Sequence, residues 1–190
     1  TRKLRKDILQ AIEQFSLMDN ELMLKVFEDI KCAELLLKTF LEDGKIKVKN
    51  VTTNRAVKNL QGRDIWLDIL AEDEAGRLLN VEVQNDDTGA IPRRARYHLS
   101  VLDANSLHSG EYFDKLPDNK VIFITANDVL DGNLPIYHVD RIIRENGAGF
   151  SDGSEIIYVN NQIKNNTPLG LLMHDFSCKE PEKMHYKELA

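Results

Sequence analysis

The stretch that decides the fold is WLDILAEDEAGRLLNVEVQ, residues 66–84. Two apolar runs flank a polar turn, and the alternation of side chains along each run predicts β-strands over residues 63–71 and 77–84. The loop EAG between them has the composition of a three-residue hairpin turn in which Gly76 takes the left-handed conformation. We therefore predict a β-hairpin inside the sheet of the domain.

The geometry of this turn fixes which residues of the two strands face each other. It places Asp68 directly opposite Glu82. Alternation then puts both acids on one face of the hairpin, together with Trp66 and Gln84. The other face is wholly apolar, and we expect it to form part of the core. Its residues are Ile65, Leu67, Ile69, Ala71, Leu79, Val81 and Val83.

Two opposed carboxylates are unfavourable in a sheet because like charges repel and apolar neighbours remove hydration. Protonation of one acid, a basic side chain between them or a divalent cation would each relieve the repulsion. Oxygen ligands on a rigid frame suit Mg²⁺ or Mn²⁺. The spacing alone also fits two solvent-exposed acids, although Trp66 and Leu70 beside Asp68 indicate a face that is partly covered.

The segments around the hairpin predict a mixed α/β domain of order α, β, β, β, α, β, followed by an extra β-hairpin. The predicted helices cover residues 19–42, as one helix or two with Asp19 or Asn20 as N-cap, and 92–107. The other predicted strands are 45–53, 120–126, 134–146 and 154–161. The last residues, 180–190, predict the start of a helix, and since the sequence begins at Thr1 we expect it to be a piece of a longer protein.

Length and composition predict one domain over residues 1–190, with a net charge of −6. This charge argues against a general nucleic-acid coat but leaves room for a local basic groove. No apolar run is long enough to span a membrane. Cys32 and Cys178 lie far apart without zinc-ligand spacing, which is typical of reduced thiols in a cytoplasmic protein. The five histidines show no metal or triad spacing, so we expect structural or surface roles for them.

An Asp on one strand, a hairpin turn and Glu-x-Gln on the next strand resemble the PD-(D/E)XK nuclease superfamily. More narrowly, the sequence resembles the PD-(D/E)XK nuclease family transposases, which are related to the Rpn recombination-promoting nucleases. The segments that carry the resemblance are MDNELMLKVFED, GRDIWLDILAEDEAGRLLNVEVQ, RRARYHLSVLDANSLHSGEYFDKLPDNKVIFI and LGLLMHDFSC. The resemblance implies a restriction-endonuclease-like α-β-β-β-α-β core over roughly residues 15–178, with a mixed sheet and an added C-terminal β-hairpin.

The resemblance also implies a metal-dependent DNA endonuclease. Asp68 and Glu82 would bind one or two Mg²⁺ or Mn²⁺ ions, with the backbone carbonyl of Val83 as a further ligand. The metal would polarise the scissile phosphate and lower the pKa of an attacking water.

Members of the superfamily often supply another acid from the first helix. Glu28 is our candidate for this ligand, and Asp19 and Asp29 are the alternatives. The alternative for each of the three, which their helical setting favours, is an acid on the helix surface.

Gln84 occupies the position at which the superfamily motif has lysine. A lysine orients water and offsets developing negative charge, whereas an amide can only orient. The narrower family commonly carries this glutamine, so we retain it as a catalytic residue. The alternative is a catalytically silent nuclease fold that binds nucleic acid or protein, and a third option is a phosphodiesterase acting on RNA or a small nucleotide.

The helix start RRAR supplies Arg93, Arg94 and Arg96, which could contact DNA phosphates or remain solvated beside neighbouring acids. Tyr97 follows them, either beside the site or in the core. DNA is therefore the expected partner, without a membrane. Double-strand cutting by two active sites would favour a homodimer.

Overall fold

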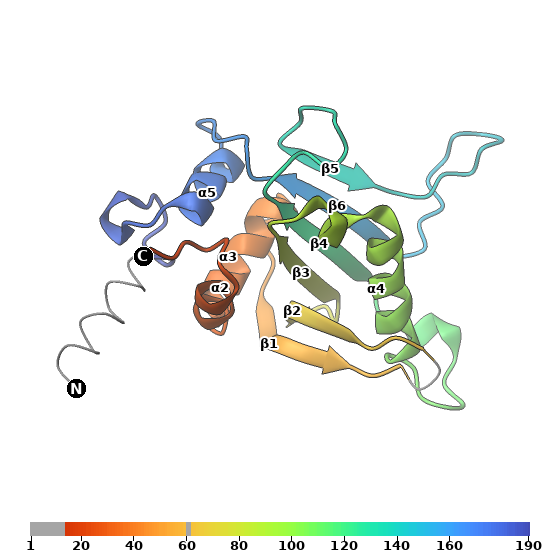
Figure 1. Cartoon of the computed structure of the whole chain (residues 1–190). Helices are drawn as coiled ribbons and strands as arrows, with labels where there is room; N and C mark the ends of the chain where they lie inside the picture. Colours follow the sequence, from red (N-terminus) through yellow and green to blue (C-terminus); the bar gives the residue numbers. More distant parts are fainter. Residues whose placement is uncertain (1–13, 60–61) are drawn as a thin grey trace.

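The computed structural model describes residues 14–59 and 62–190, and the described chain forms a six-stranded mixed sheet with helices on both faces (Figure 1). The strands are β1 (Val48–Val57), β2 (Ile65–Asp73), β3 (Leu78–Gln84), β4 (Asn119–Thr125), β5 (Ile136–Val139) and β6 (Ser154–Asn160). The α-helices are α2 (Asn20–Val26), α3 (Ile30–Phe40), α4 (Pro92–Ala104) and α5 (Pro168–Ser177).

The strand order across the sheet is β1-β2-β3-β4-β6-β5. The first three strands form an antiparallel meander, β3, β4 and β6 run parallel, and β5 pairs antiparallel with β6 at the edge. Because β4 follows the crossover helix α4, it can lie parallel beside β3. This arrangement confirms the predicted fold class, including the added hairpin of β5 and β6.

Two hydrophobic clusters hold the layers together. On one face, α4 packs through Ala95, Leu99 and Leu102, which form an apolar stripe along this helix. On the other face, α2, α3 and α5 cover the sheet, and Phe27 stacks on Phe176. Figure 1 shows α4 alone on its side of the sheet.

The N-terminal helical segment is two helices rather than one. The carboxylate of Asp29 accepts a hydrogen bond from the backbone N–H of Lys31 at 2.7 Å, which caps the start of α3. Asp19 is the residue before α2, but its carboxylate accepts from Ser16 rather than from a helix N–H.

The hairpin turn has the predicted geometry. Gly76 has φ 81°, and its N–H donates to the carbonyl of Asp73 at 3.0 Å. The strands then pair in the predicted register, with Ile69 opposite Val81. That pair is the last of the ladder between β2 and β3 on the side away from the turn.

The prediction that the apolar residues of the hairpin share one face was wrong, although their predicted burial in the core is confirmed for β2. The predicted core residues of β2 are all buried, yet Leu67 lies in the cluster under α4 and Ile69 in the cluster under α3. Asn54 on β1 has φ 50°, and the pairs with β2 run from Thr53↔Ile69 directly to Arg55↔Leu67. Asp68 therefore lies at the point in β2 where the alternation of side chains between the two faces of the sheet is interrupted.

Two further predictions differ from the structure at the C-terminal side. The strand expected over 134–146 is only the four residues of β5, and the chain beyond it forms an exposed loop with one bridge between Ile142 and Gly149. The expected helix at 180–190 is a single 3-10 turn, Pro181–Lys183. Among the described residues, no helix combines the length and apolarity that crossing a bilayer requires.

Candidate active site

Asp68 and Glu82, the two acids predicted to face each other, link β2 to β3 through hydrogen bonds to the backbone of the opposite strand. Asp68 Oδ2 accepts a hydrogen bond from the backbone N–H of Val83 at 2.9 Å. Glu82 Oε1 accepts from the backbone N–H of Asp68 at 3.3 Å. Side-chain oxygens thus take the place of ladder hydrogen bonds beyond the last β2–β3 pair. We call Asp68 and Glu82 the acid pair.

The acid pair lies in surroundings that disfavour its negative charge. Glu82 is 0% exposed and Asp68 is half-buried. Burial and the charge of Asp68 together raise the pKa of Glu82 to about 8, and burial raises the pKa of Asp68. The pair therefore has too little positive charge beside it to be stable as two carboxylates at neutral pH.

The nearest counter-charge comes from α4. Arg94 Nη2 lies 3.4 Å from Glu82 Oε2, and Arg94 Nη1 lies 3.5 Å from Gln84 Oε1. Both contacts are long, so the guanidinium compensates the acid pair only in part. Gly89 makes room for this arrangement, since a Cβ there would lie 2.0 Å from Gln84 Oε1.

His98 and Asn80 complete the surroundings of Glu82. From the sequence, His98 was expected to be structural or exposed, and Asn80 was assigned no role. His98 Nδ1 is 3.7 Å from Glu82 Oε1 and 3.4 Å from the Asn80 amide, and its Nε2 accepts from Arg94 Nε at 3.4 Å. Burial, with the charge of Arg94, lowers the pKa of His98 to about 4, so this imidazole is neutral. Asn80 precedes Glu82 by two residues, so alternation could have found it. No local signal marks His98, which lies within the apolar stripe of α4.

The donor set of the acid pair fits a hard divalent cation. It consists of carboxylate oxygens on two adjacent strands, and the raised pKa values mean that added positive charge is favourable there. The N–H of Val83 points toward β2, and in a strand the carbonyl of the same residue points to the same edge. Mg²⁺ or Mn²⁺ would suit these oxygen ligands better than a softer metal.

The three candidate acids from the first helices lie elsewhere. Glu28 is exposed and pairs with a neighbouring lysine, Asp29 caps α3, and Asp19 accepts from the serine three residues before it. Within residues 14–59 and 62–190, no hydrogen bond or ion pair joins any of them to the acid pair. The chain next to Asp19 does lie against the end of β3, because Asn85 Nδ2 donates to the carbonyl of Met18 at 2.8 Å.

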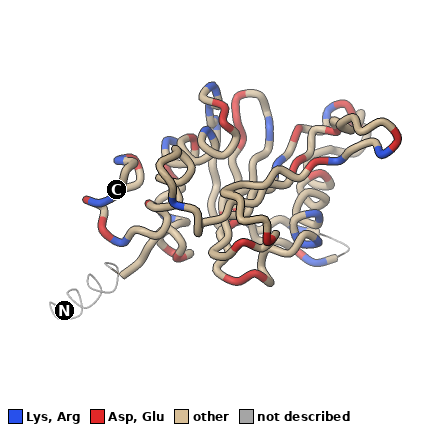
Figure 2. The backbone as a smooth tube through the Cα atoms, turned by 90° about the horizontal axis from the view of Figure 1, so that it is seen from above, with Lys and Arg blue, Asp and Glu red and all other residues tan. Residues whose placement is uncertain are grey.

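A groove of about 730 Å³ opens between α4 and the loop before β2. Three arginines line it, Arg63, Arg93 and Arg94, and Figure 2 shows Lys and Arg positions gathered along α4. Tyr97 also lines the groove, and its hydroxyl donates to the carbonyl of Arg63 at 2.5 Å. Arg96 lies apart, in a depression beside β5 and β6. The structure therefore brings two of the three predicted helix arginines to one groove.

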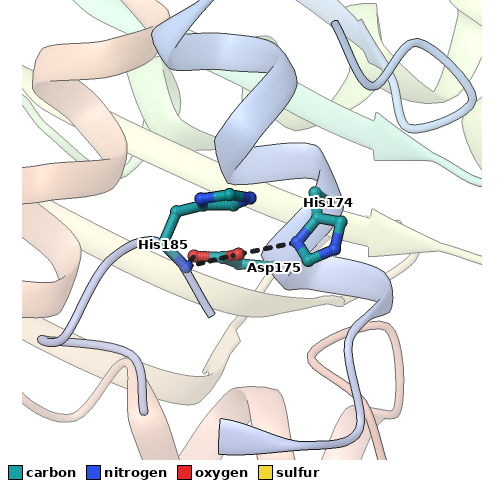
Figure 3. Close-up of side chains that lie close together, drawn as sticks. All are labelled: His174, Asp175 and His185. Carbon is teal, nitrogen blue, oxygen red and sulfur yellow. Dashed lines mark hydrogen bonds and ion pairs between the residues drawn. The ribbon is translucent and has the colours of Figure 1, made fainter. Parts of the chain in front are cut away.

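A second polar group lies far along the chain, at the end of α5 (Figure 3). Asp175 is 0% exposed, and its carboxylate accepts from His174 Nδ1 and from the backbone N–H groups of His185 and Tyr186, at 2.8 to 3.0 Å. The two imidazoles contact each other edge to face. Because both oxygens of Asp175 already accept N–H groups, the cluster serves to tie the C-terminal segment to α5.

Asp175→Ala is expected to lower the free energy of unfolding by roughly 3 kcal/mol, because it leaves backbone N–H groups unpaired. Urea unfolding followed by circular dichroism measures this loss. The matched control is Glu182→Ala, an exposed acid in the same segment, which should change stability by less than about 0.5 kcal/mol. Equal stability of the Asp175 variant and wild type would contradict the assignment of a structural tie.

Comparison with known proteins agrees with the geometry of the acid pair. The model of the PD-(D/E)XK nuclease family transposases matches residues 12–167, well over half of the chain. No curated protein and no solved structure matches the chain. The matched region contains the whole hairpin, the acid pair, Gln84 and α4. The chain therefore belongs to the PD-(D/E)XK nuclease family transposases, and its role is nuclease- or transposase-related.

Proposed function

We propose that this protein is a metal-dependent DNA endonuclease that hydrolyses phosphodiester bonds in transposition or recombination. The observation that carries the proposal is the acid pair, in which each carboxylate is fixed by the opposite strand and has a raised pKa. Acids with perturbed pKa values beside a groove are typical of catalytic sites, and Arg94 and His98, which lie against Glu82, line the arginine-lined groove. The neighbouring arginines supply a surface for a phosphate backbone.

Asp68 and Glu82 would hold the cation through their carboxylates, and Val83 through its backbone carbonyl. When bound, the cation would polarise the scissile phosphate and lower the pKa of the attacking water. A further acid from the first helices, Glu28 or Asp19, would have to approach the acid pair on binding. A double-strand cut would need two such sites, which a homodimer would supply. We place the protein in the cytoplasm, in line with its two free thiols.

Gln84 and Arg94 would together replace the lysine of the superfamily motif. The amide of Gln84 is fixed through its oxygen by Arg94 and can orient a water. The guanidinium of Arg94 lies beside Glu82 and supplies the positive charge that an amide lacks. Such a charge stabilises the transition state, in which negative charge develops on the phosphate oxygens.

Arg94→Ala is expected to lower kcat by about 10²-fold, because the positive charge beside the phosphate is lost. Arg94→Lys should retain part of the activity, since it keeps the charge but not the planar donor geometry. Single-turnover cleavage of a labelled DNA measures both. Arg144→Ala removes an exposed arginine from the loop after β5 and should leave kcat unchanged. An unchanged kcat for Arg94→Ala would exclude Arg94 as the replacement for lysine.

The proposal is tested with supercoiled plasmid and purified protein. We expect nicking or linearisation with Mg²⁺ or Mn²⁺ and none in EDTA. Absence of cleavage with every divalent metal, from demonstrably folded protein, would count against it.

The second candidate is a catalytically silent module that binds nucleic acid. The long contact from Arg94 to Glu82 favours it, because a guanidinium already lies where a cation would be attracted. Salt-dependent DNA binding without cutting would select this reading. Competition with RNA and with small nucleotides separates both candidates from a phosphodiesterase that acts on those substrates.

A further inference from the structure

Trp66 is a large apolar side chain left in solvent on a strand. It is 61% exposed, although its neighbours Ile65 and Leu67 are both buried. Trp66 pairs with Ala56 across the β1–β2 ladder, so its backbone is held in place. An exposed indole on a fixed backbone binds a flat partner with little loss of conformational entropy, because an aromatic side chain has few rotatable bonds.

The surroundings of Trp66 select an anionic partner. Trp66 lines the same groove as Arg63, Arg93 and Arg94. Arg94 Nε lies 3.4 Å from His98 Nε2, and both residues line the groove together with Arg63. In the part of the chain that the structure describes, no ion pair engages Arg63 or Arg93. The one acid that lines the groove, Asp64, is already paired with a lysine at 2.7 Å.

The groove that Trp66 lines reaches the acid pair through Arg94. Arg94 lines the same groove, and its Nη2 lies 3.4 Å from Glu82 Oε2. A polymer that places a phosphate at the acid pair would therefore present its neighbouring unit to the indole. In a regular duplex the faces of the bases are covered by stacking, whereas an unpaired strand offers them to aromatic side chains.

We propose that Trp66 and the arginine-lined groove form a binding site for single-stranded DNA, in which the indole stacks on an unpaired base. The position of that base next to the scissile phosphate rests on the proposed nuclease function, but the stacking itself does not. The expected substrate therefore has a single-stranded segment at the cut, such as a flap, a gap or an end.

The test uses the fact that Trp66 is the only tryptophan of the chain. Protein in EDTA, which prevents metal-dependent cutting, is titrated with oligo(dT) and with a duplex of equal length. Oligo(dT) is expected to quench the intrinsic fluorescence and to bind at least about tenfold more tightly than the duplex. Fluorescence anisotropy of labelled oligo(dT) should give a Kd roughly 10- to 100-fold weaker for Trp66→Ala. Trp66→Phe should recover most of the affinity.

The control variant is Phe113→Ala, which removes an aromatic side chain that is 88% exposed and does not line the groove. It should bind oligo(dT) like wild type, and thermal unfolding checks that all three variants are folded. Absence of quenching, equal affinity for duplex and single strand, or wild-type affinity of Trp66→Ala would overturn the inference.

These outcomes are independent of cleavage. Metal-dependent cutting of duplex with no role for Trp66 would leave the proposed function standing and remove the base-binding site. Quenching and binding by oligo(dT) without cutting under any metal would establish the base-binding site and select the silent module.

Discussion

Asp68→Asn is expected to abolish metal-dependent DNA cleavage, with a loss of at least roughly 10³-fold in rate. The variant keeps the shape of the side chain but removes one of the two charges that would bind the cation. A loss of several kcal/mol of transition-state stabilisation corresponds to this factor. The measurement is nicking of supercoiled plasmid over a wide range of Mg²⁺ and Mn²⁺ concentrations, so that weakened metal binding is separated from lost chemistry.

The same variant should remain folded. An asparagine oxygen can still accept the N–H of Val83, which Asp68 accepts at 2.9 Å. Removing a negative charge beside buried Glu82 also relieves the repulsion that raises the pKa of that acid. We therefore expect the free energy of unfolding at pH 7 to be unchanged or higher, as at other sites where function is retained at a cost in stability.

A matched control lies on the same strand. Glu72→Gln makes the same chemical change four residues away, at a partly exposed acid paired with Lys49. It should cleave DNA within about twofold of wild type. Wild-type cleavage by folded Asp68→Asn would mean that the acid pair is not the metal site.

The hairpin could be predicted because its determinants are local. Gly76 is required at a left-handed position of a short loop, and the loop then sets the register that brings Ile69 opposite Val81. That register was sufficient to bring Asp68 and Glu82 together. The paired acids could therefore be found from 19 consecutive residues, 66–84.

The change of face at Asp68 could not be predicted from the hairpin alone. It accompanies a left-handed residue on the preceding strand, Asn54, whose effect depends on the pairing of β1 with β2. Period-two alternation assumes a regular strand, and it fails where the partner strand is irregular.

The contacts that residues of α4 make in the site also could not be predicted from the sequence. The start of the helix at Pro92 was predictable. Which side chain of RRAR reaches Glu82 depends on the rotation of α4 against the sheet, and only packing fixes that rotation. For this reason Arg94 was expected at DNA phosphates, and His98 was expected to be structural.

The C-terminal segment shows tertiary structure overriding local preference. Its sequence favours a helix, but Asp175 binds the backbone N–H groups of His185 and Tyr186. A buried carboxylate with several charge-assisted hydrogen bonds outweighs the small propensity differences of a short segment.

In metal-free buffer, the melting temperature is expected to fall as the pH rises from 6.5 to 8. The pKa of Glu82 is about 8 in the folded protein and near 4.5 as the ordinary value, so the folded state binds this proton more strongly. Its contribution to stability is present at low pH and is lost as the pH rises through 8. The expected loss over this interval is roughly 2 kcal/mol, or about 4–8 °C.

The pH interval begins at 6.5 because, below that pH, the protonation of His98 changes the stability in the opposite direction. The pKa of His98 is about 4 when folded and 6.5 as the ordinary value, so its contribution to stability is lost as the pH falls from 6.5 to 4. Between pH 6.5 and 8 the imidazole is neutral in the folded state, and the acid pair dominates the slope. Glu82→Gln should therefore flatten the dependence of the melting temperature on pH in this interval.

Mg²⁺ should reverse the loss, and it should do so more strongly at pH 8 than at pH 6.5. The cation binds the ionised acid pair, so its binding competes with protonation and its stabilisation grows with the ionised fraction. Differential scanning calorimetry with MgCl₂, against NaCl of equal ionic strength, separates binding from screening. Equal stabilisation at both pH values, or the same Mg²⁺ effect in Glu82→Gln, would place the cation elsewhere. A larger effect at pH 8 that disappears in Glu82→Gln would assign the raised pKa and the metal to the same two carboxylates, because only a shared site couples the two equilibria.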